Sequence, residues 1–251
     1  MNLLKSVWRK IRTQDQPKDL TLEFLDRNVR HFMRSYILSL DDELFPANQR
    51  LMDLSLKVGR SALGIDLTDI SLKFPFESVG RYINVWPGEH YRLLAAIVKE
   101  IKPQLVIEIG TATGASSLVM KEYLPQNGKI ITYDVIPWNE YPASGLNQQD
   151  FGEQLEQRIV DISVQSNADL QYDVLKKADL IFVDGAKDGV SESAFIKLFD
   201  RISFENNPIV LFDDIKFDIM IKIWREIKHP KLDITSFGHW SGTGLVDWSK
   251  S

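Results

Sequence analysis

Acidic residues directly follow four of the apolar segments in this sequence. These acids are Asp134, Asp161, Asp184 and Asp213. The apolar segments before them are typical of buried strands, and the carboxyl ends of parallel strands lie along one edge of an open sheet. One such acid is well explained as a helix N-cap. Four of them favour a shared ligand crevice at that edge.

A glycine-containing turn follows the apolar run 105–109 and precedes a helix-forming segment. Gly110 and Gly114 remove the Cβ where the chain turns sharply and let a ligand approach the backbone. An NAD-binding turn would carry a third glycine and receive a pyrophosphate. Glu108 would repel that anion and suits a cationic ligand, such as a sulfonium carrying an amino group. The residues expected to hold the ligand here are Glu108, Gly110, Thr111, Thr113, Gly114, Ser116 and Ser117.

Composition limits the classes of protein that this chain can belong to. The chain has 251 residues, is 44% hydrophobic and carries a formal net charge of −5, which argues against a general nucleic-acid binder. It contains no cysteine, which excludes thiolate metal sites and fits a cytoplasmic protein. No apolar run is long enough for stable membrane insertion. Basic residues interrupt the apolar N-terminal positions, so no signal peptide is expected.

The hydrophobic pattern divides the chain at about residue 75. Residues 1–75 read as a helical arm and cap, and within them residues 3–12 form a basic amphipathic helix. These N-terminal helices offer a surface for a homodimer. Residues 76–251 alternate strands and helices, which predicts an α/β, Rossmann-like, seven-stranded and mostly parallel sheet with helices on both faces. The expected strands are 105–109, 129–133, 158–160, 180–183, 209–212, 232–237 and 244–248.

The segment Glu108–Gly114, the acid Asp134 and the alternating pattern resemble class I S-adenosylmethionine-dependent methyltransferases. The closer likeness, over about residues 86–248, is to the metal-dependent O-methyltransferases of the catechol and caffeoyl-coenzyme A type. Those enzymes carry D-x-x-K-D after the fourth strand, matched here by Asp184–Asp188, and an Asp-Asn pair after the fifth. The pair is Asp213-Asp214 in this chain. That variant resembles a bacterial branch with macrocin-type sugar O-methyltransferases, which implies natural-product biosynthesis.

The resemblance implies roles for several residues. Asp184, Asp213 and Asp214 would offer oxygen ligands to Mg²⁺ or Mn²⁺. Lys187 would take the proton of the acceptor hydroxyl if a nearby metal disfavours the lysine's charge, and His239 is the alternative base. Asp134 would accept hydrogen bonds from the ribose of S-adenosylmethionine. Cofactor-binding roles at the ends of the third and fourth strands are implied for Asp161, Ile162 and Asp184.

Three functions remain open at this point. The leading one is metal-assisted O-methylation of a hydroxyl on a small-molecule metabolite, with S-adenosylmethionine as donor. The second is metal-independent N-methylation, in which the crowded acids bind a cationic amine. The third is a catalytically silent methyltransferase fold that binds a partner protein through its N-terminal helix and cap.

Overall fold

The computed structural model describes residues 44–249 and contains a seven-stranded sheet in the order β3-β2-β1-β4-β5-β7-β6. Strands β1 to β5 are mutually parallel, whereas β7 is antiparallel to both β5 and β6. The strands are β1 Leu105–Ile109, β2 Lys129–Asp134, β3 Leu155–Ile159, β4 Leu180–Val183, β5 Ile209–Asp213, β6 Lys231–Asp233 and β7 Thr243–Asp247. The predicted mostly parallel, Rossmann-like sheet is confirmed. The amphipathic helix predicted at residues 3–12 lies outside the described residues.

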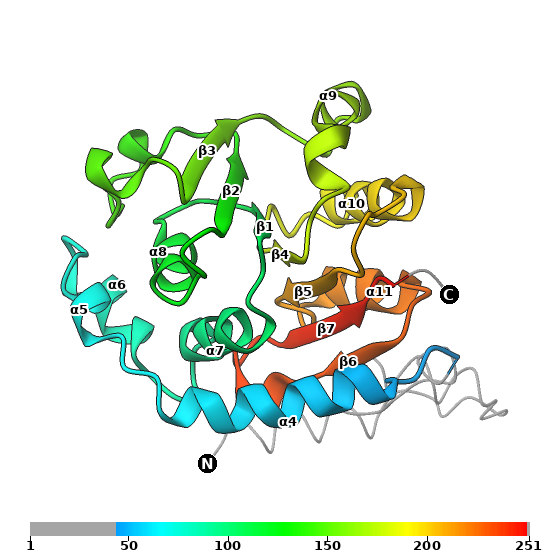
Figure 1. Cartoon of the computed structure of the whole chain (residues 1–251), viewed down its shortest axis with the longest axis horizontal. Coiled ribbons are helices and arrows are strands. Elements are labelled where there is room, and N and C mark those ends of the chain that lie inside the picture. The colour runs from blue at the N-terminus through cyan, green and yellow to red at the C-terminus, as the bar shows by residue number, and fades with distance from the viewer. Residues whose placement is uncertain (1–43, 250–251) are drawn as a thin grey trace, which may run out of the picture. The chain divides into compact units, whose positions relative to one another are not determined.

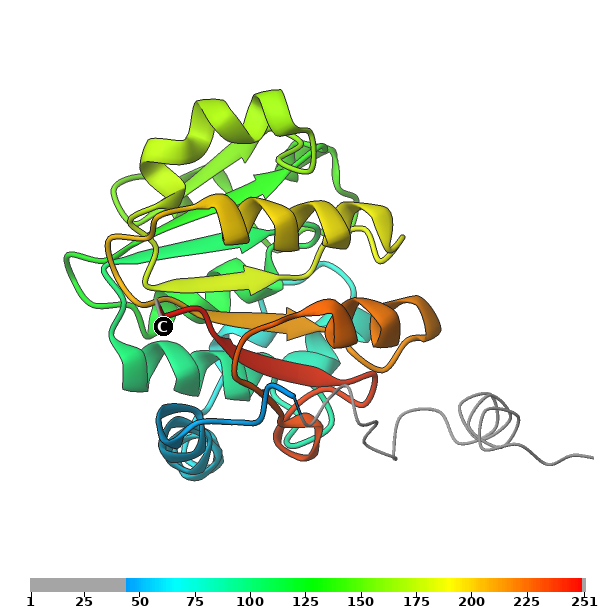
Figure 2. The same cartoon turned by 90° about the vertical axis from the view of Figure 1, so that its right-hand side faces the viewer.

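Helices cover both faces of the sheet (Figure 1). One layer contains α4 (Gln49–Leu63), α7 (Tyr91–Ile101) and α8 (Ala115–Glu122). The other contains α9 (Gln165–Leu175), α10 (Val190–Arg201) and α11 (Asp218–Glu226). Figure 2 shows these three helices in front of the sheet.

Each central strand buries side chains on both faces, because neighbouring residues of a strand point to opposite sides. On β1, Val106 packs in the cluster with α7 and α8, and Ile107 packs in the cluster with α9 and α10. Both side chains are fully buried. This two-sided burial explains why the strand sequences are continuous apolar runs.

The described part of the predicted cap shares its core with the α/β domain. Leu51 and Val58 of α4 are fully buried in the same cluster as Leu94 of α7 and Leu245 of β7. Two shorter helices, α5 (Thr68–Ser71) and α6 (Glu77–Ile83), follow α4. The domain boundary at residue 75 stays a prediction, but residues 44–75 do not bury a core of their own.

The edge strands differ from their predicted bounds. β3 spans Leu155–Ile159 rather than 158–160, because polar residues occupy its centre and the apolar-run criterion misses them. Glu156 in β3 pairs with Lys129 of the neighbouring β2 at 2.5 Å and with Arg158 at 2.7 Å. At the other edge, β6 ends at Asp233, and a 3₁₀ turn (η3, Thr235–Phe237) replaces its predicted second half.

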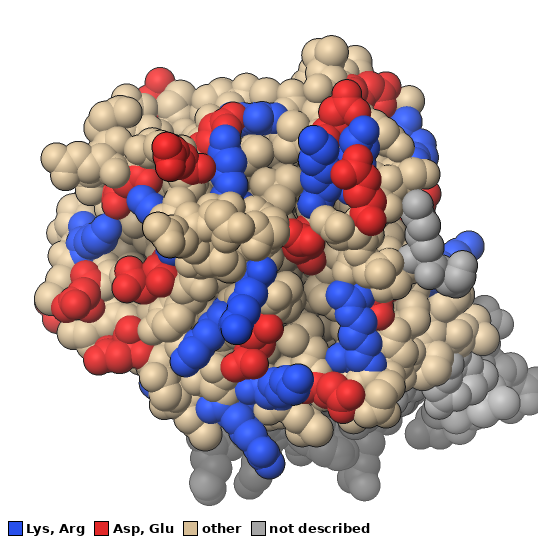
Figure 3. Space-filling model, in the orientation of Figure 1, with Lys and Arg blue, Asp and Glu red and all other residues tan. Residues whose placement is uncertain are grey.

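The surface and helix composition give two further observations. On the face seen in Figure 3, acidic and basic side chains are interspersed rather than gathered in a patch of one sign. Within residues 44–249, no helix combines the length and the apolar character that crossing a membrane requires.

Candidate active site

A cavity of about 470 Å³ opens at the carboxyl ends of the parallel strands. Three of the four predicted strand-end acids line it, namely Asp134, Asp161 and Asp184. Gly110 and Ile162 line it too, whereas Asp213 does not. This volume is within the range of small-molecule and cofactor sites. The shared crevice that the sequence predicts is therefore present, on β1 to β4.

The turn between β1 and α8 depends on its two glycines. Gly110 has φ +102°, and a Cβ there would lie 2.2 Å from the backbone oxygen of Asp184. Gly114 has φ +77°, and a Cβ there would lie 2.3 Å from the side chain of Leu146. Both positions thus require glycine because neighbouring protein atoms leave no room for a Cβ. This reason adds to the sharp turn and the approach of a ligand, which were inferred from the sequence.

Asp134 holds this turn against β2. Its carboxylate accepts hydrogen bonds from the backbone N–H groups of Thr111 and Ala112 at 2.8 and 2.9 Å. It also accepts from those of Val135 and Ile136, at 2.7 and 3.0 Å. A carboxylate has about four lone-pair sites, so a ribose diol at this position would have to share an acid that the backbone already engages.

Glu108 lies at the centre of a buried polar group behind the turn. It has no exposed surface, and its Oε2 accepts a hydrogen bond from the Ser117 hydroxyl. Its Oε1 has no hydrogen-bond partner among residues 44–249. Burial raises the pKa of Glu108 to about 7, although hydrogen bonds from Ser116, Ser117 and Thr132 lower it. The predicted cofactor residues that do not line the cavity are Glu108, Thr111, Thr113, Gly114, Ser116 and Ser117.

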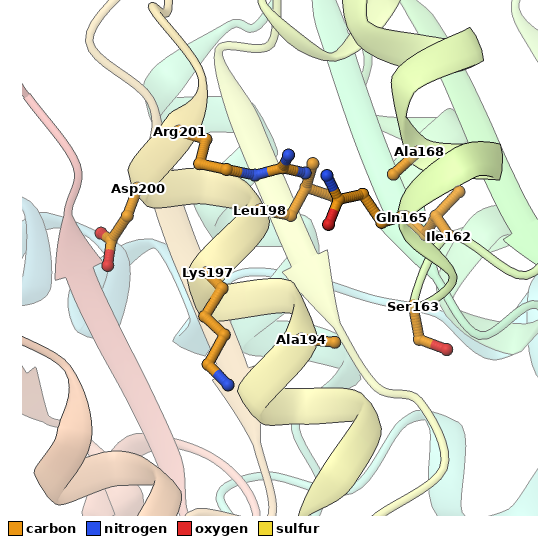
Figure 4. A pocket seen from close by; sticks show the side chains of 9 residues that line it. All are labelled: Ile162, Ser163, Gln165, Ala168, Ala194, Lys197, Leu198, Asp200 and Arg201. Carbon is orange, nitrogen blue, oxygen red and sulfur yellow. The ribbon is translucent and has the colours of Figure 1, made fainter.

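At the end of β3, Asp161 and Ile162 line the main cavity as the resemblance implies. Ser163 donates to Asp161 Oδ1 through its N–H at 2.9 Å and its hydroxyl at 2.6 Å. Ile162 also borders a second hollow of about 440 Å³ beside α9 and α10. Figure 4 shows Arg201 extending across that hollow toward Gln165. None of the four strand-end acids lines it.

The three predicted metal ligands come together beside the cavity. Ligand oxygens of Asp184, Asp213 and Asp214 lie within 4.8 Å of one another. Lys187 lies among them, with Nζ 2.6 Å from Asp184 Oδ1 and 3.3 Å from Asp214 Oδ2. Lys187 and Asp214 both have left-handed backbone conformations, with φ of 57° and 59°. Such strain in non-glycine residues clusters at functional sites.

The carboxylates around Lys187 favour its protonated form and so disfavour its action as a general base. Burial by itself lowers the pKa of Lys187, but the surrounding carboxylates raise it well above its usual value. A general base at neutral pH requires a lowered pKa. Burial and the charge of Asp213 raise the pKa of Asp184 to about 6, although Lys187 opposes this. With these neighbours and without a metal ion, Lys187 is a charged counter-ion, and its role as a base beside a bound metal stays a prediction.

His239 reaches the same cluster from the turn before β7. Its Nδ1 lies 3.3 Å from Asp214 Oδ1, and its Nε2 lies 2.8 Å from Glu89 Oε2. Ser241 contacts both His239 Nδ1 and Asp214 Oδ1 through its hydroxyl. Although burial favours the neutral ring, hydrogen bonding to Asp214 raises the pKa of His239. The predicted alternative base is therefore within the acid cluster.

Three residues of the site had no role assigned from the sequence. His90 is only 4% exposed and its Nδ1 lies 3.3 Å from Asp213 Oδ1, and Glu89 contacts His239. Glu192 is fully buried and accepts from the N–H groups of Lys187 at 2.6 Å and Gly189 at 2.7 Å. A glutamate three residues after a helix N-cap is a capping-box signal, so Glu192 could have been found. Nothing in the spacing of His90 predicts its contact with Asp213.

Comparison with known proteins gives two kinds of match. Residues 79–202 match the model of the O-methyltransferase family. A stretch of 102 residues is 28% identical to catechol O-methyltransferase of Mus musculus and covers 39% of this chain. It covers 37% of the mouse enzyme, so the chain matches little more than a third of the length of that relative.

The solved structures that resemble this chain are similar at low identity. One is an O-methyltransferase from Bacillus cereus in complex with SAH, with a TM-score of 0.48, 14% identity, and coverage of 90% of this chain and 97% of that one. Another is an O-methyltransferase from Streptomyces achromogenes in complex with SAM, with a TM-score of 0.45, 16% identity, and coverage of 90% and 98%.

The family match extends over α7, the parallel strands β1 to β4 and the turn that carries Asp184 and Lys187. These elements supply the walls of the cavity and part of the acid cluster. Over this part, the chain is similar to the O-methyltransferase family.

Proposed function

We propose that this protein is an S-adenosylmethionine-dependent O-methyltransferase that acts on a hydroxyl group of a small molecule with the help of a divalent metal ion. The observation that carries the proposal is the position of Asp184. This residue lines the 470 Å³ cavity and also belongs to the cluster with Asp213, Asp214 and Lys187. A cofactor in the cavity and an acceptor at the cluster would therefore be neighbours.

The cavity fits a cationic nucleoside cofactor. Four carboxylates line it, those of Asp134, Asp161, Asp184 and Asp188, and Glu108 behind it has one buried oxygen that lacks a hydrogen-bond partner among the described residues. These acids favour a ligand with a positive charge. S-adenosylmethionine supplies an electrophilic methyl group when bound. The role of the protein in methyl transfer would be to hold donor and acceptor in line, which is a large part of catalysis in such displacements.

The acid cluster fits a hard divalent cation. Asp184, Asp213 and Asp214 offer oxygen atoms only, which suits Mg²⁺ or Mn²⁺, and Asp213 Oδ1 has no hydrogen-bond partner within residues 44–249. Such a cation stabilises the oxyanion of a deprotonated acceptor. Lys187 or His239 would receive the acceptor proton, and each would first have to lose its own proton, which the neighbouring carboxylates stabilise.

A second candidate is metal-independent N-methylation. The observation that favours it is the ammonium group of Lys187, which lies 2.6 Å from Asp184 and 3.3 Å from Asp214. A cation of the protein thus already neutralises part of the cluster. A cationic amine acceptor could bind the remaining carboxylate charge without a metal.

Calorimetry separates these candidates. Binding of S-adenosylhomocysteine to the purified protein is expected, and its absence would overturn the whole proposal. Addition of Mg²⁺ or Mn²⁺ should then give a second binding event that Asp213→Asn removes and Asp169→Asn, a change at an exposed acid outside the cavity, leaves intact. Turnover of amine acceptors that a chelator does not affect would favour metal-independent N-methylation.

We further propose a cytoplasmic role in natural-product biosynthesis, on the basis of the resemblance to the macrocin-type branch, and a homodimer formed through the N-terminal helices. Light scattering of the full chain, compared with a variant that begins at residue 44, tests the dimer. A monomeric mass for the full chain would contradict it.

A further inference from the structure

A second set of donor atoms adjoins the three carboxylates. Ligand atoms of His90, Asp213 and His239 also lie within 4.8 Å of one another. The two sets share Asp213, which is 3% exposed and ends β5. His90 directly precedes α7, and His239 lies in the turn before β7. The topology thus brings two imidazoles to one carboxylate from distant parts of the chain.

Two members of this set, His90 and Asp213, have buried atoms without a hydrogen-bond partner in the part of the chain that the structure describes, whereas Nδ1 of His239 contacts the Ser241 hydroxyl. Both ring nitrogens of His90 and Oδ1 of Asp213 are buried and lack a hydrogen bond there. The 3.3 Å from His90 Nδ1 to Asp213 Oδ1 and the 3.5 Å from His239 Nδ1 to the same oxygen exceed the ~2.7–2.9 Å of charge-assisted hydrogen bonds. An unpartnered buried polar group in a native structure requires an explanation.

The same distances fit three ligands of one ion. Donor atoms arranged tetrahedrally around a metal at bond lengths of about 2.1 Å are about 3.4 Å apart. The contacts of Asp213 Oδ1 with His90 Nδ1 and His239 Nδ1, at 3.3 and 3.5 Å, bracket that value. Asp213 Oδ1 therefore lies at the spacing of a co-ligand from both imidazole nitrogens, rather than at the distance of a charge-assisted hydrogen bond.

His239 is held in the orientation that a metal ligand needs. Its Nε2 faces Glu89 at 2.8 Å, and its backbone N–H donates to Thr243 Oγ1 at 3.0 Å. A carboxylate that accepts from the second ring nitrogen of a histidine fixes the tautomer and directs the other nitrogen at a metal. Because Nε2 of His239 faces Glu89, Nδ1 is the nitrogen that can bind a metal beside Asp213.

Asp213 has different neighbours toward Asp184 and Asp214 than toward His90 and His239. Beside Asp184 and Asp214 lies the ammonium group of Lys187. On the side of the imidazoles, His90 packs edge-on against Phe182 at 5.5 Å and against the ring of His239 at 5.1 Å. The rings of His90, Phe182 and His239 therefore pack together on this side of Asp213. This side offers nitrogen donors where the Lys187 side offers oxygen donors.

We propose that His90, Asp213 and His239 bind a first-row transition-metal dication, such as Zn²⁺, Co²⁺ or Mn²⁺, through two imidazole nitrogens and one carboxylate oxygen, in preference to Mg²⁺. Imidazole favours transition metals, whereas Mg²⁺ favours oxygen ligands. The identity of the bound metal follows from these donor types alone. Its part in catalysis rests on the proposed methyltransferase function.

Pulsed electron paramagnetic resonance of the Mn²⁺-loaded full chain tests the assignment. We expect nitrogen couplings from coordinated imidazole in the wild-type protein and binding of Mn²⁺ at least tenfold tighter than that of Mg²⁺. His239→Gln should remove one imidazole coupling and weaken Mn²⁺ binding at least tenfold, and His90→Gln should do the same. The matched control is His229→Gln, because His229 pairs with Asp200 at 3.0 Å outside the cluster.

The outcomes separate this inference from the proposed function. Bound Mn²⁺ without nitrogen couplings, or equal affinities for Mn²⁺ and Mg²⁺, would overturn the inference and leave an all-oxygen site. Absence of any divalent-ion binding, with S-adenosylhomocysteine still bound, would show that the histidines form only an ion-pair network. If buried His90→Gln does not fold, the half-buried His239→Gln decides the result, with S-adenosylhomocysteine binding as the check of its fold.

Discussion

Glu108 is a carboxylic acid without exposed surface, and burial raises its pKa to about 7 from 4.5. An acid whose pKa is raised by folding stabilises the protein fully below the unfolded pKa, and that contribution is lost as the pH rises through the folded pKa. A shift of this size corresponds to about 3 kcal/mol. We therefore expect the free energy of unfolding of the wild-type protein to fall by about 3 kcal/mol, relative to Glu108→Gln, between pH 4 and pH 9.

Chemical denaturation across this pH range measures the difference. Glu153→Gln is the control, because Glu153 is exposed and its replacement should leave the pH profile of the wild type unchanged. Parallel profiles for the wild type and Glu108→Gln would show that Glu108 titrates alike in the folded and unfolded chain.

The ion pairs of Lys187 are expected to stabilise the folded protein. Its side chain is 16% exposed and its ammonium group pairs with Asp184 and Asp214. Removal of one partner from a buried ion pair costs about 3–5 kcal/mol, because the other charges remain. Lys187→Met should lose stability by that amount. It should regain more of its melting temperature on addition of Mg²⁺ or Mn²⁺ than the wild type gains.

Thermal denaturation with and without the cation tests this expectation. Lys222→Met serves as the control, since Lys222 is 81% exposed and its nitrogen lies 3.8 Å from Glu226. A Lys187→Met variant as stable as the wild type would contradict the ion pairing described above.

Some of these side chains were predictable and others were not, for a physical reason. Asp184 and Asp213 follow apolar runs that are buried on both faces, so their position at the strand ends can be deduced from the sequence. His90 precedes a helix, and only the packing of α7 against the sheet brings it to Asp213. No local pattern encodes that contact. The raised pKa of Lys187 could not be deduced from the sequence for a related reason, since it depends on three carboxylates at the ends of two strands.

The β1–α8 turn shows how an element depends on one backbone position. Gly110 has φ +102° and no room for a Cβ, which would lie 2.2 Å from the backbone oxygen of Asp184. Gly110→Ala should therefore cost about 2 kcal/mol or more, because the substitution adds a steric clash to a conformation that L residues avoid. Because Gly110 lines the cavity, the affinity for S-adenosylhomocysteine should fall as well.

Calorimetry and denaturation of the same variant measure both effects. Gly64→Ala is the matched control, since Gly64 has φ −96° and its nearest neighbour would lie 3.7 Å from the new Cβ. It should change stability by less than about 0.5 kcal/mol. Full cofactor affinity in Gly110→Ala would show that the turn does not shape the binding cavity.

Central and edge elements were predictable to different degrees. Strands β1, β2, β4 and β5 lie within a residue of their predicted positions, because each is a continuous apolar run between charged or turn residues. The predicted range of β3 is displaced because Glu156, near the centre of the strand, forms ion pairs with Lys129 and Arg158 and interrupts the apolar pattern. Edge strands need less apolar sequence, so hydrophobicity locates them less well.

The arrangement of the whole sheet explains how the site is assembled. The order β3-β2-β1-β4-β5-β7-β6 places the ends of β1 and β4 side by side at its centre. The cavity forms along β1 to β4, and the groups proposed to bind a metal gather where β4, β5 and the turn before β7 meet. Asp184 at the end of β4 belongs to both, so the proposed cofactor and metal sites meet at one residue.

Helix α4 extends the core of this fold beyond the region that matches the O-methyltransferase family. Arg50 and Asn48, at its start, contact the buried Asp247 of β7 at 2.5 and 2.8 Å. Leu51 is fully buried in the cluster that includes Leu245 of the same strand. The helix is thus attached to the sheet by both polar and apolar contacts, and it should unfold together with the α/β domain.

Leu51→Ala tests this cooperation. Truncation of a fully buried leucine costs about 2–5 kcal/mol, and we expect the whole protein to unfold at a lower denaturant concentration in a single transition. S-adenosylhomocysteine should still shift that transition, because ligand binding stabilises everything that unfolds with its site. Leu56→Ala, on the same helix but 58% exposed, should leave the midpoint nearly unchanged. Two separate transitions, or a ligand-shifted transition that Leu51→Ala does not affect, would instead place an independent cap before residue 75.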